Sequence, residues 1–469
     1  MSNFWDSSIW GTFLLIGVLL VSMLAANALK KTVPLLQESL IPTSVLGGSI
    51  LLVIEGIYRL AAGDALFEAE LFGGNGTTIL EVLTYHCLAL GFIASSFKTS
   101  KNKLTKKRTF EIFNTGVTTV STYLLQGIVG LVITMIAAEV MTGFFEAAGV
   151  LLPFGFGQGT GQALNYGNIY ETEFGFAGGK SFGLSIAALG FLSASIGGVI
   201  HLNVLKRKNK LVVADPDQLD FSIEDVHSSD EIPMQESVDK LTIQVSLVAV
   251  AYILTYAMMQ GLGALLPGMK SVIFGFNFLL GVLSATLMKV AMRVRRKSGM
   301  MKKEYTNNFL MTRVSNFFFD LMVVAGVAAI RLDTLKDYWA VLLILALAGL
   351  IVTYVYNRVV ARKLFPRYSE EQFLMMYGML TGTASTGIIL LREIDGEFKT
   401  PASDNMVYQN LPAIVFGFPI MLLATLAPVK PMLTLMIFIL FFAAMNVILF
   451  RAVIFKKRRI KKLLKQKTV

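Results

Sequence analysis

The sequence predicts an all-α polytopic membrane protein, built from two inverted repeats of five transmembrane helices, each with a re-entrant hairpin, plus one extra C-terminal transmembrane helix. Three observations lead to this fold class. First, 54% of the 469 residues are hydrophobic and only 16% are charged, which lies outside the range of soluble domains. Second, apolar runs long enough to cross a bilayer recur along the chain. Third, each half contains one stretch in which glycines and hydroxyl side chains interrupt the apolar pattern.

A membrane crossing needs about 20 mostly apolar residues. Such runs predict a first repeat over residues 1–205 and a second over residues 241–428, followed by the extra helix and a basic tail in residues 429–469. The acidic segment 206–240 has no apolar run long enough for a core, so we expect a cytoplasmic linker with a solvated His227. The expected spans are 9–28, 44–60, 79–97, 113–141, 180–205, 242–266, 271–292, 309–330, 340–359, 408–426 and 432–455.

Short loops give the orientation, because Lys and Arg accumulate on the cytoplasmic side of a membrane. Basic loops follow the first, third and fifth spans and the C-terminal tail is basic, whereas the loop after the second span is acidic. We therefore expect the N-terminus outside and the C-terminus in the cytoplasm, with the protein in the cell (inner) membrane. No Lys or Arg precedes the first apolar run, so a cleaved signal peptide is not expected. These loops account for the net charge of +11, and nucleic-acid binding is not expected.

The first interruption lies in residues 143–178. The loop charges place the chain outside on both sides of this segment, so it must enter the membrane and return, which predicts a re-entrant hairpin. Glycines occupy every second position, at Gly155, Gly157, Gly159 and Gly161. Alternating glycines are unfavourable inside a helix, so the sequence predicts unwound backbone around them that a ligand can approach closely. The alternative is a packing kink, because such glycines also let membrane helices pack closely.

A second interruption falls in residues 373–392, where Gly382-Thr383 matches Gly159-Thr160 of the first. The loop charges predict that this segment dips from the cytoplasmic side. The two hairpins are therefore expected to enter from opposite faces and to meet near the membrane midplane. An odd number of crossings in each half inverts the second repeat relative to the first.

Neutral polar side chains around both interruptions are costly in lipid unless they line a polar site. They suit a dehydrated ion and a small polar solute, because they offer many hydrogen bonds and few charges. Broken-helix ends also favour an anion, since a helix N-terminus carries about half a positive charge and free N–H groups. The candidate substrate-binding residues are Gln158, Gly159, Thr160, Gly161, Thr381, Gly382, Thr383, Ser385 and Thr386.

The candidate residues for cation coupling are Gly157, Asn316 and Asp320. Asp320 lies within an expected span, with Asn316 one turn earlier on the same face. A carboxylate in the membrane is expensive unless an ion or a proton shares it. The alternative is that Asp320 is a structural partner of Arg313, which also lies on that face.

Other polar residues in the spans have simpler interpretations. Glu55, Glu81 and Lys289 lie near expected span ends, where snorkelling to the interface accounts for them. His86 and His201 are expected to be hydrogen-bonded interior residues. The single cysteine allows neither a disulfide nor a Cys-based metal site within one chain. No cofactor is expected, no metal beyond a transported sodium ion, and no ATP-driven step, since the chain has no phosphate-binding loop.

Four motifs occur in order along the chain: Ile-Pro-Thr-Ser-Val-Leu-Gly-Gly at 41–48, Gly-Gln-Gly-Thr-Gly at 157–161, Glu-x-x-Phe-Gly-Phe at 171–176 and Ile-Gly-Gly at 196–198. With them the sequence resembles the bacterial sodium/glutamate symporter family, as a divergent member, over most of its length. The resemblance implies a homodimer of inverted-repeat subunits whose hairpins carry substrate and sodium. It implies sodium-coupled symport of glutamate or a related small carboxylate by alternating access, and no enzymatic activity.

An ion channel is the alternative function, with a filter formed by the two hairpins. A channel needs both hairpins to line one continuous pore, whereas a transporter exposes its site to one side at a time. A membrane enzyme is less favoured, because no His, Cys or carboxylate cluster is expected on one face of a span.

Overall fold

The computed structural model describes residues 4–98, 105–207, 231–233, 238–301, 303–396 and 399–451. Within these ranges the chain is helical and contains no strand, which confirms the all-α class; one isolated bridge joins Glu231 to Glu304. Most of the expected linker 206–240, including His227, and the basic tail after residue 451 lie outside the described residues.

In the first half of the chain, five long helices cover the five expected spans, and their ends agree to within four residues except that the fourth helix begins seven residues earlier than expected. They are α1 (Ser7–Thr32), α3 (Thr43–Ala62), α4 (Gly76–Phe97), α5 (Lys106–Val140) and α7 (Gly179–Arg207). Between them lie the short helix α2 (Pro34–Glu38), the 3-10 helices η1 (Leu66–Glu68), η2 (Glu70–Phe72) and η3 (Glu146–Val150), and the helix α6 (Leu151–Phe174).

The second half contains the remaining spans, one of which is broken. The expectation of a single helix over 271–292 is wrong, because α10 (Lys270–Gly275) ends before Phe276 and α11 (Asn277–Lys297) begins after it. Polar groups at this break have partners on α4: the Asn277 amide donates to the Tyr85 backbone carbonyl at 3.0 Å, and the Tyr85 hydroxyl donates to the Phe274 carbonyl at 2.8 Å. The other elements are α9 (Lys240–Leu265), η5 (Pro267–Met269), α12 (Asn308–Ala328), η6 (Leu332–Leu335), α13 (Trp339–Leu364), α14 (Ser369–Thr381), α15 (Ala384–Arg392), α16 (Ala402–Tyr408), α17 (Asn410–Leu426) and α18 (Pro431–Leu449).

By length and composition, ten of the described helices are able to cross a membrane, or eleven when the bent pair of α16 and α17 counts as one span. Their outward faces are apolar. On α13, for example, Leu343, Leu347, Ile351 and Val355 are all more than half exposed and recur every four residues, which places them on one side of the helix. Faces of this kind are stable against lipid and not against water, so the protein is a multi-pass membrane protein.

Local signals fix several helix ends. The side chains of Thr105, Asp239 and Asn307 each accept a backbone N–H from the first turn of α5, α9 and α12, respectively. At the other end of α3, Gly63 adopts φ 75° and ψ 4°, the left-handed conformation in which glycine commonly ends a helix.

The chain forms two compact units, and each unit takes segments from both halves of the sequence. Unit 1 draws its described residues from Met1–Lys103, Gln158–Ala188 and Asp215–Trp339, and unit 2 draws them from Leu104–Gly157, Leu189–Ala214 and Ala340–Val469. The units are therefore not the two expected repeats, which divide the chain by sequence position; the repeat boundaries stay a prediction.

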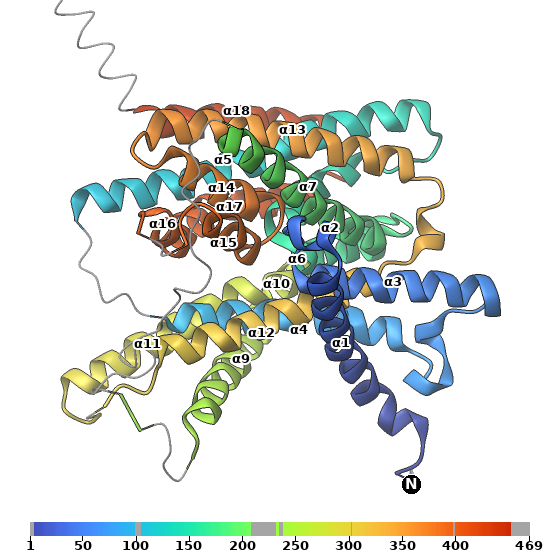
Figure 1. Ribbon diagram of the computed structural model, residues 1–469, viewed down its shortest axis with the longest axis horizontal. Helices are drawn as coiled ribbons and strands as arrows, with labels where there is room; N and C mark the ends of the chain where they lie inside the picture. Colours follow the sequence, from blue (N-terminus) through green and yellow to red (C-terminus); the bar gives the residue numbers. More distant parts are fainter. Residues whose placement is uncertain are drawn as a thin grey trace, which may run out of the picture. The chain divides into compact units, whose positions relative to one another are not determined.

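Each unit has its own packing centre. In unit 1, α4 packs against α11 and α12, which run beside it in Figure 1, and α3 also packs on α12. A fully apolar cluster between these helices includes Ile93, Phe97, Val248 and Met311. In unit 2, α5 packs against η3, α17 and α18, and α14 lies against α15.

Candidate functional site

One residue, Gly159, interrupts α6. Its φ of 77° and ψ of −169° are non-helical, whereas the residues on either side belong to helix. This backbone conformation is essentially restricted to glycine. The expectation of a longer unwound stretch around the alternating glycines is therefore wrong, and the break is confined to a single position.

The neighbouring glycines serve close packing instead. A Cβ on Gly157 would lie 2.1 Å from Cε1 of Tyr123, and the Tyr123 hydroxyl donates to the Gly157 carbonyl at 3.0 Å. A Cβ on Gly161 would lie 2.8 Å from a methyl carbon of Leu88 in α4. The packing alternative thus describes these two positions, and helical backbone survives there because the contacts on both sides compensate for the poor helix propensity of glycine.

After the break, α6 belongs to unit 1 and its polar side chains turn inward. Thr160 is fully buried and donates to the Met322 carbonyl of α12 at 3.3 Å. The Asn165 amide donates to Gln162 Oε1 at 3.0 Å and to the Gly275 carbonyl, at the end of α10, at 3.3 Å. Gln162 Nε2 is buried with no hydrogen-bond acceptor in the described residues. A buried donor without an acceptor costs free energy, so this part of α6 favours a ligand that accepts hydrogen bonds.

A cavity of about 530 Å³ lies beside this part of α6 within unit 1. Ligand pockets commonly have volumes of about 300–1,000 Å³ and combine apolar walls with a few polar groups. The walls come from α4, the second part of α6, the start of α7 and α10. The polar lining residues are Glu81, Tyr85, Asn165, Asn168, Thr172, Glu173, Lys180 and Ser271.

An ion cluster sits at this cavity. The Lys180 ammonium lies 2.8 Å from Glu81 Oε2 and 3.7 Å from Glu171 Oε1, and an Arg331 nitrogen lies 3.7 Å from Glu81 Oε1. The side chains of Lys180 and Glu81 are 19% and 13% exposed. Snorkelling to an interface is therefore the wrong interpretation of Glu81, which is held by two cations inside unit 1. Sequence reasoning missed Lys180, because it marks only the start of an apolar run and its partner lies 99 residues earlier.

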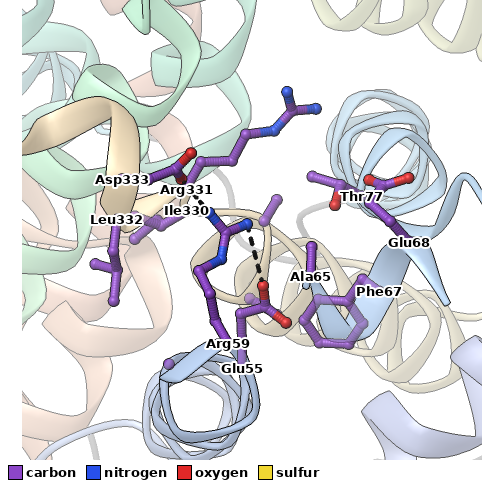
Figure 2. A pocket seen from close by; sticks show the side chains of 13 residues that line it. Glu55, Arg59, Ala65, Phe67, Glu68, Thr77, Ile330, Arg331, Leu332 and Asp333 are labelled. Atoms are coloured by element: carbon purple, nitrogen blue, oxygen red, sulfur yellow. Dashed lines mark ion pairs between the residues drawn. The ribbon is translucent and has the colours of Figure 1, made fainter. Parts of the chain in front are cut away.

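A smaller cavity of about 210 Å³ shares Arg331 with this cluster. Figure 2 shows Arg59 there between Asp333, at 2.9 Å, and Glu55, at 3.5 Å. Glu55 is buried and also accepts the Leu66 backbone N–H at 2.8 Å. Glu55 thus ties the end of α3 to the following loop, and its interpretation as a snorkelling residue is wrong.

The second interruption lies in unit 2, between α14 and α15. Gly382 has φ −148° and ψ −108°, and Thr383 is extended, so the helix stops after Thr381 and restarts at Ala384, as the Gly382-Thr383 pair predicts. The Thr383 and Thr386 hydroxyls are 3.4 Å apart, and no side chain caps the start of α15. The uncapped N–H groups of a helix N-terminus attract an anion.

The structure therefore places the candidate substrate residues in two groups. Gln158, Gly159, Thr160 and Gly161 surround the break in α6, and Thr381, Gly382, Thr383, Ser385 and Thr386 surround the break between α14 and α15. The Thr381 hydroxyl donates to the Tyr377 carbonyl at 2.6 Å within α14. Whether the two groups meet stays a prediction.

The candidate cation residues belong to both units. Gly157 lies in α6 just before the break, with its carbonyl bound by a tyrosine, whereas Asn316 and Asp320 lie on an exposed face of α12. The Arg313 guanidinium of the same helix lies 4.9 Å from the centre of the Phe309 ring. The role of Asp320 in coupling stays a prediction.

His201 is a hydrogen-bonded interior residue, as expected. Its Nδ1 lies 2.8 Å from the Tyr354 hydroxyl and its Nε2 lies 2.9 Å from Glu370 Oε2. Arg358 pairs with both oxygens of Glu370. Burial acts to raise the pKa of Glu370, but the hydrogen bonds and charges of His201 and Arg358 outweigh it and lower this pKa to about 2. The first turn of α14 is therefore tied to α7 and α13 by a charged carboxylate.

No known protein-family model matches this chain, and no curated protein matches it significantly. Among the described residues, no group of three or more His, Cys, Asp or Glu side chains is placed to hold a metal ion.

Proposed function

We propose that the protein is a sodium-coupled secondary active transporter, a symporter that takes up glutamate or a related small carboxylate by alternating access. The observation that carries this proposal is the single break of α6 at Gly159, in a helix whose following turns, from Leu164 on, line a cavity of about 530 Å³. Interrupted helices in a membrane protein persist where they line a polar cavity, and such interruptions mark transport sites.

The proposed architecture follows the sequence prediction. Two inverted repeats, 1–205 and 241–428, carry re-entrant hairpins at 143–178 and 373–392 that enter from opposite faces, and a homodimer lies in the cell membrane with each N-terminus outside. An interruption at a Gly-Thr pair in each half, at Gly159-Thr160 and Gly382-Thr383, and matching sets of five spans support this arrangement. The four sequence motifs support membership of the sodium/glutamate symporter family.

Three groups favour a carboxylate as the substrate. In unit 1, Gln162 Nε2 is a buried donor without an acceptor among the described residues, and Lys180 is the cation that lines the cavity, beside Glu81 and Glu173. In unit 2, the N-terminus of α15 presents N–H groups that no side chain caps. Carboxylates accept several hydrogen bonds and gain from each of these groups. A co-transported cation is needed because an isolated carboxylate pays a large desolvation cost on entering a medium of low dielectric constant.

Uptake into proteoliposomes tests the function. We expect radiolabelled glutamate or a related dicarboxylate to accumulate with an inward sodium gradient and not with an equal potassium gradient. Substrate-driven counterflow without net current supports a carrier, whereas steady current without counterflow supports the channel with a hairpin filter. Accumulation of only neutral or cationic solutes would refute the proposed substrate class.

A pair of lysine variants tests the cavity. Lys180→Gln removes the positive charge that lines it, and we expect the apparent KM for the carboxylate to rise at least tenfold with a smaller change in kcat. Lys289→Gln is the matched control, because the Lys289 ammonium donates to the backbone carbonyls of Ser96 and Lys98, at 2.7 and 2.9 Å, and does not line the cavity. Equal changes in KM for the two variants would show that the cavity does not bind substrate.

A further inference from the structure

Four uncharged side chains of unit 2 form one buried hydrogen-bond network, which we call the amide network. Thr122 and Gln126 lie one turn apart on α5, and Thr353 and Asn357 lie one turn apart on α13. Each of the four is at most 1% exposed. Gln126 Nε2 donates to Thr353 Oγ1 at 2.8 Å, and Asn357 Nδ2 donates to Thr122 Oγ1 at 3.3 Å.

The network has more acceptors than donors. Gln126 Nε2 also donates to the Leu380 carbonyl at 2.9 Å, and Asn357 Nδ2 also donates to the Thr353 carbonyl at 2.9 Å. Both N–H groups of each amide are thus used, and turning either amide over would place its oxygen against a carbonyl oxygen. Gln126 Oε1 and Asn357 Oδ1 are left buried without any donor among the described residues.

The nearby hydroxyl groups do not supply the missing donors. The Thr122 hydroxyl donates to the Thr118 carbonyl at 2.8 Å, back along α5. The Thr381 hydroxyl donates to the Tyr377 carbonyl at 2.6 Å within α14. A buried oxygen without a donor costs free energy unless a positive group or ion faces it, and this network contains two such oxygens.

The end of α14 adds negative potential at the same place. Leu380, whose carbonyl binds Gln126, is in the last turn of α14, and the chain leaves the helix at Gly382. The C-terminal end of a helix carries about half a negative charge, which favours cations there. Discontinuous helices of membrane transporters coordinate coupling cations with such C-terminal ends and with the carbonyls of unwound backbone.

We infer that the amide network and the C-terminal end of α14 form a binding site for one dehydrated monovalent cation, with Gln126 Oε1 and Asn357 Oδ1 as ligands. The ligands are neutral oxygens, which suit a hard cation of single charge, whereas a divalent cation requires carboxylates. Because a cation here is attracted to the carbonyl groups in the last turn of α14, its binding holds the backbone at the break between α14 and α15, where Thr383 lies. This inference rests on the proposed function and places the coupling cation in unit 2 and not at Asp320.

The test is sodium binding by the purified full-length protein, measured as the thermal unfolding midpoint against sodium concentration at constant ionic strength with choline or potassium as the replacement. We expect saturable stabilisation by sodium in the wild type. Gln126→Leu and Asn357→Leu should each raise the half-saturating sodium concentration at least tenfold. Gln244→Leu is the matched control, because Gln244 is equally buried but both of its polar atoms are hydrogen-bonded, so this variant should keep the wild-type sodium dependence.

Thr353→Val keeps the side-chain shape and serves if the leucine variants do not fold; it should raise the half-saturating concentration at least threefold. The inference would be overturned if folded variants kept the wild-type sodium dependence, or if sodium did not specifically stabilise the wild type. Bound water would then be the partner of the two oxygens. A rise caused only by Asp320→Asn would overturn it too. Sodium binding that depends on Gln126 without any carboxylate uptake would support the site and refute the proposed transport function.

Discussion

Replacing Gly159 by alanine tests whether the break in α6 is needed for transport. With φ at 77° and ψ at −169°, Gly159 occupies a region that L-residues avoid, and holding alanine there costs about 3 kcal/mol. Every 1.4 kcal/mol corresponds to about a tenfold change in an equilibrium constant, so the population of the native break falls roughly 100-fold unless the helix closes over it.

Gly63→Ala is the matched control. Gly63 has nearly the same φ, 75°, but a ψ of 4°, and no atom lies within 4 Å of a Cβ placed there. Left-handed helical conformation costs an alanine only roughly 1 kcal/mol, and this glycine ends α3 away from either interruption.

The assay is the initial rate of sodium-driven uptake into proteoliposomes, together with the thermal unfolding midpoint of each variant. We expect Gly159→Ala to lower uptake at least tenfold while the protein remains inserted and monodisperse, and Gly63→Ala to stay within twofold of wild type. Uptake by Gly159→Ala above half of the wild-type rate would refute the reasoning. In that case α6 would be a packing helix and its break would not belong to the transport site.

Three further predictions concern other parts of the chain. Single cysteines at Glu146 and Glu371, in a Cys87→Ala background, should react with an impermeant thiol reagent from outside and inside, respectively; labelling of both from one side would contradict the inverted topology. The pKa of Glu370 is lowered to about 2 in the folded protein, so its charged carboxylate stabilises the fold at every pH above the ordinary glutamate pKa of about 4.5. This contribution, about 3 kcal/mol, is lost as the pH falls from about 4.5 towards 2. Glu370→Gln should therefore lower the thermal unfolding midpoint at pH 7 and reduce the fall of this midpoint between pH 5 and pH 3. If the midpoint of the variant falls as steeply as that of the wild type, other carboxylates cause the acid destabilisation. Tyr123→Phe removes the hydroxyl that binds α6 just before its break, and it should lower stability by about 1 kcal/mol in chemical unfolding; no loss would mean that water replaces this bond.

Most of the helical fold follows from the sequence because membrane spans are apolar runs of a set length. The boundaries of α1, α3, α4, α9 and α18 agree with the apolar runs to within a few residues at most ends. The break at Phe276 escaped prediction, because apolar residues continue on both sides of it and the hydrogen bond of Asn277 beside it joins a residue of α4 far away in the sequence.

The candidate site was predicted only in part, and the reason differs from residue to residue. A run of glycines predicts weak helix propensity, but it does not reveal that Tyr123 and Leu88 fill the space beside Gly157 and Gly161. Lys180 binds a glutamate far away in the sequence, so neither residue shows its role locally. Gln126 sits inside an expected span as one amide among apolar residues, and only the hydrogen bonds of its neighbours expose its unsatisfied oxygen.

The interleaved units have a consequence for biogenesis. The main partners of α4 are α11 and α12, and the hydrogen bond from Ser315 to the Gly91 carbonyl joins residues 224 positions apart. At translation rates of about 5–20 residues per second, α4 waits roughly 10–45 s after synthesis before that partner emerges. Nascent chains that stop in the acidic segment hold the first five spans without the helices that complete either unit. If the two halves are expressed as separate chains, we therefore expect stable folding to require that both are inserted together.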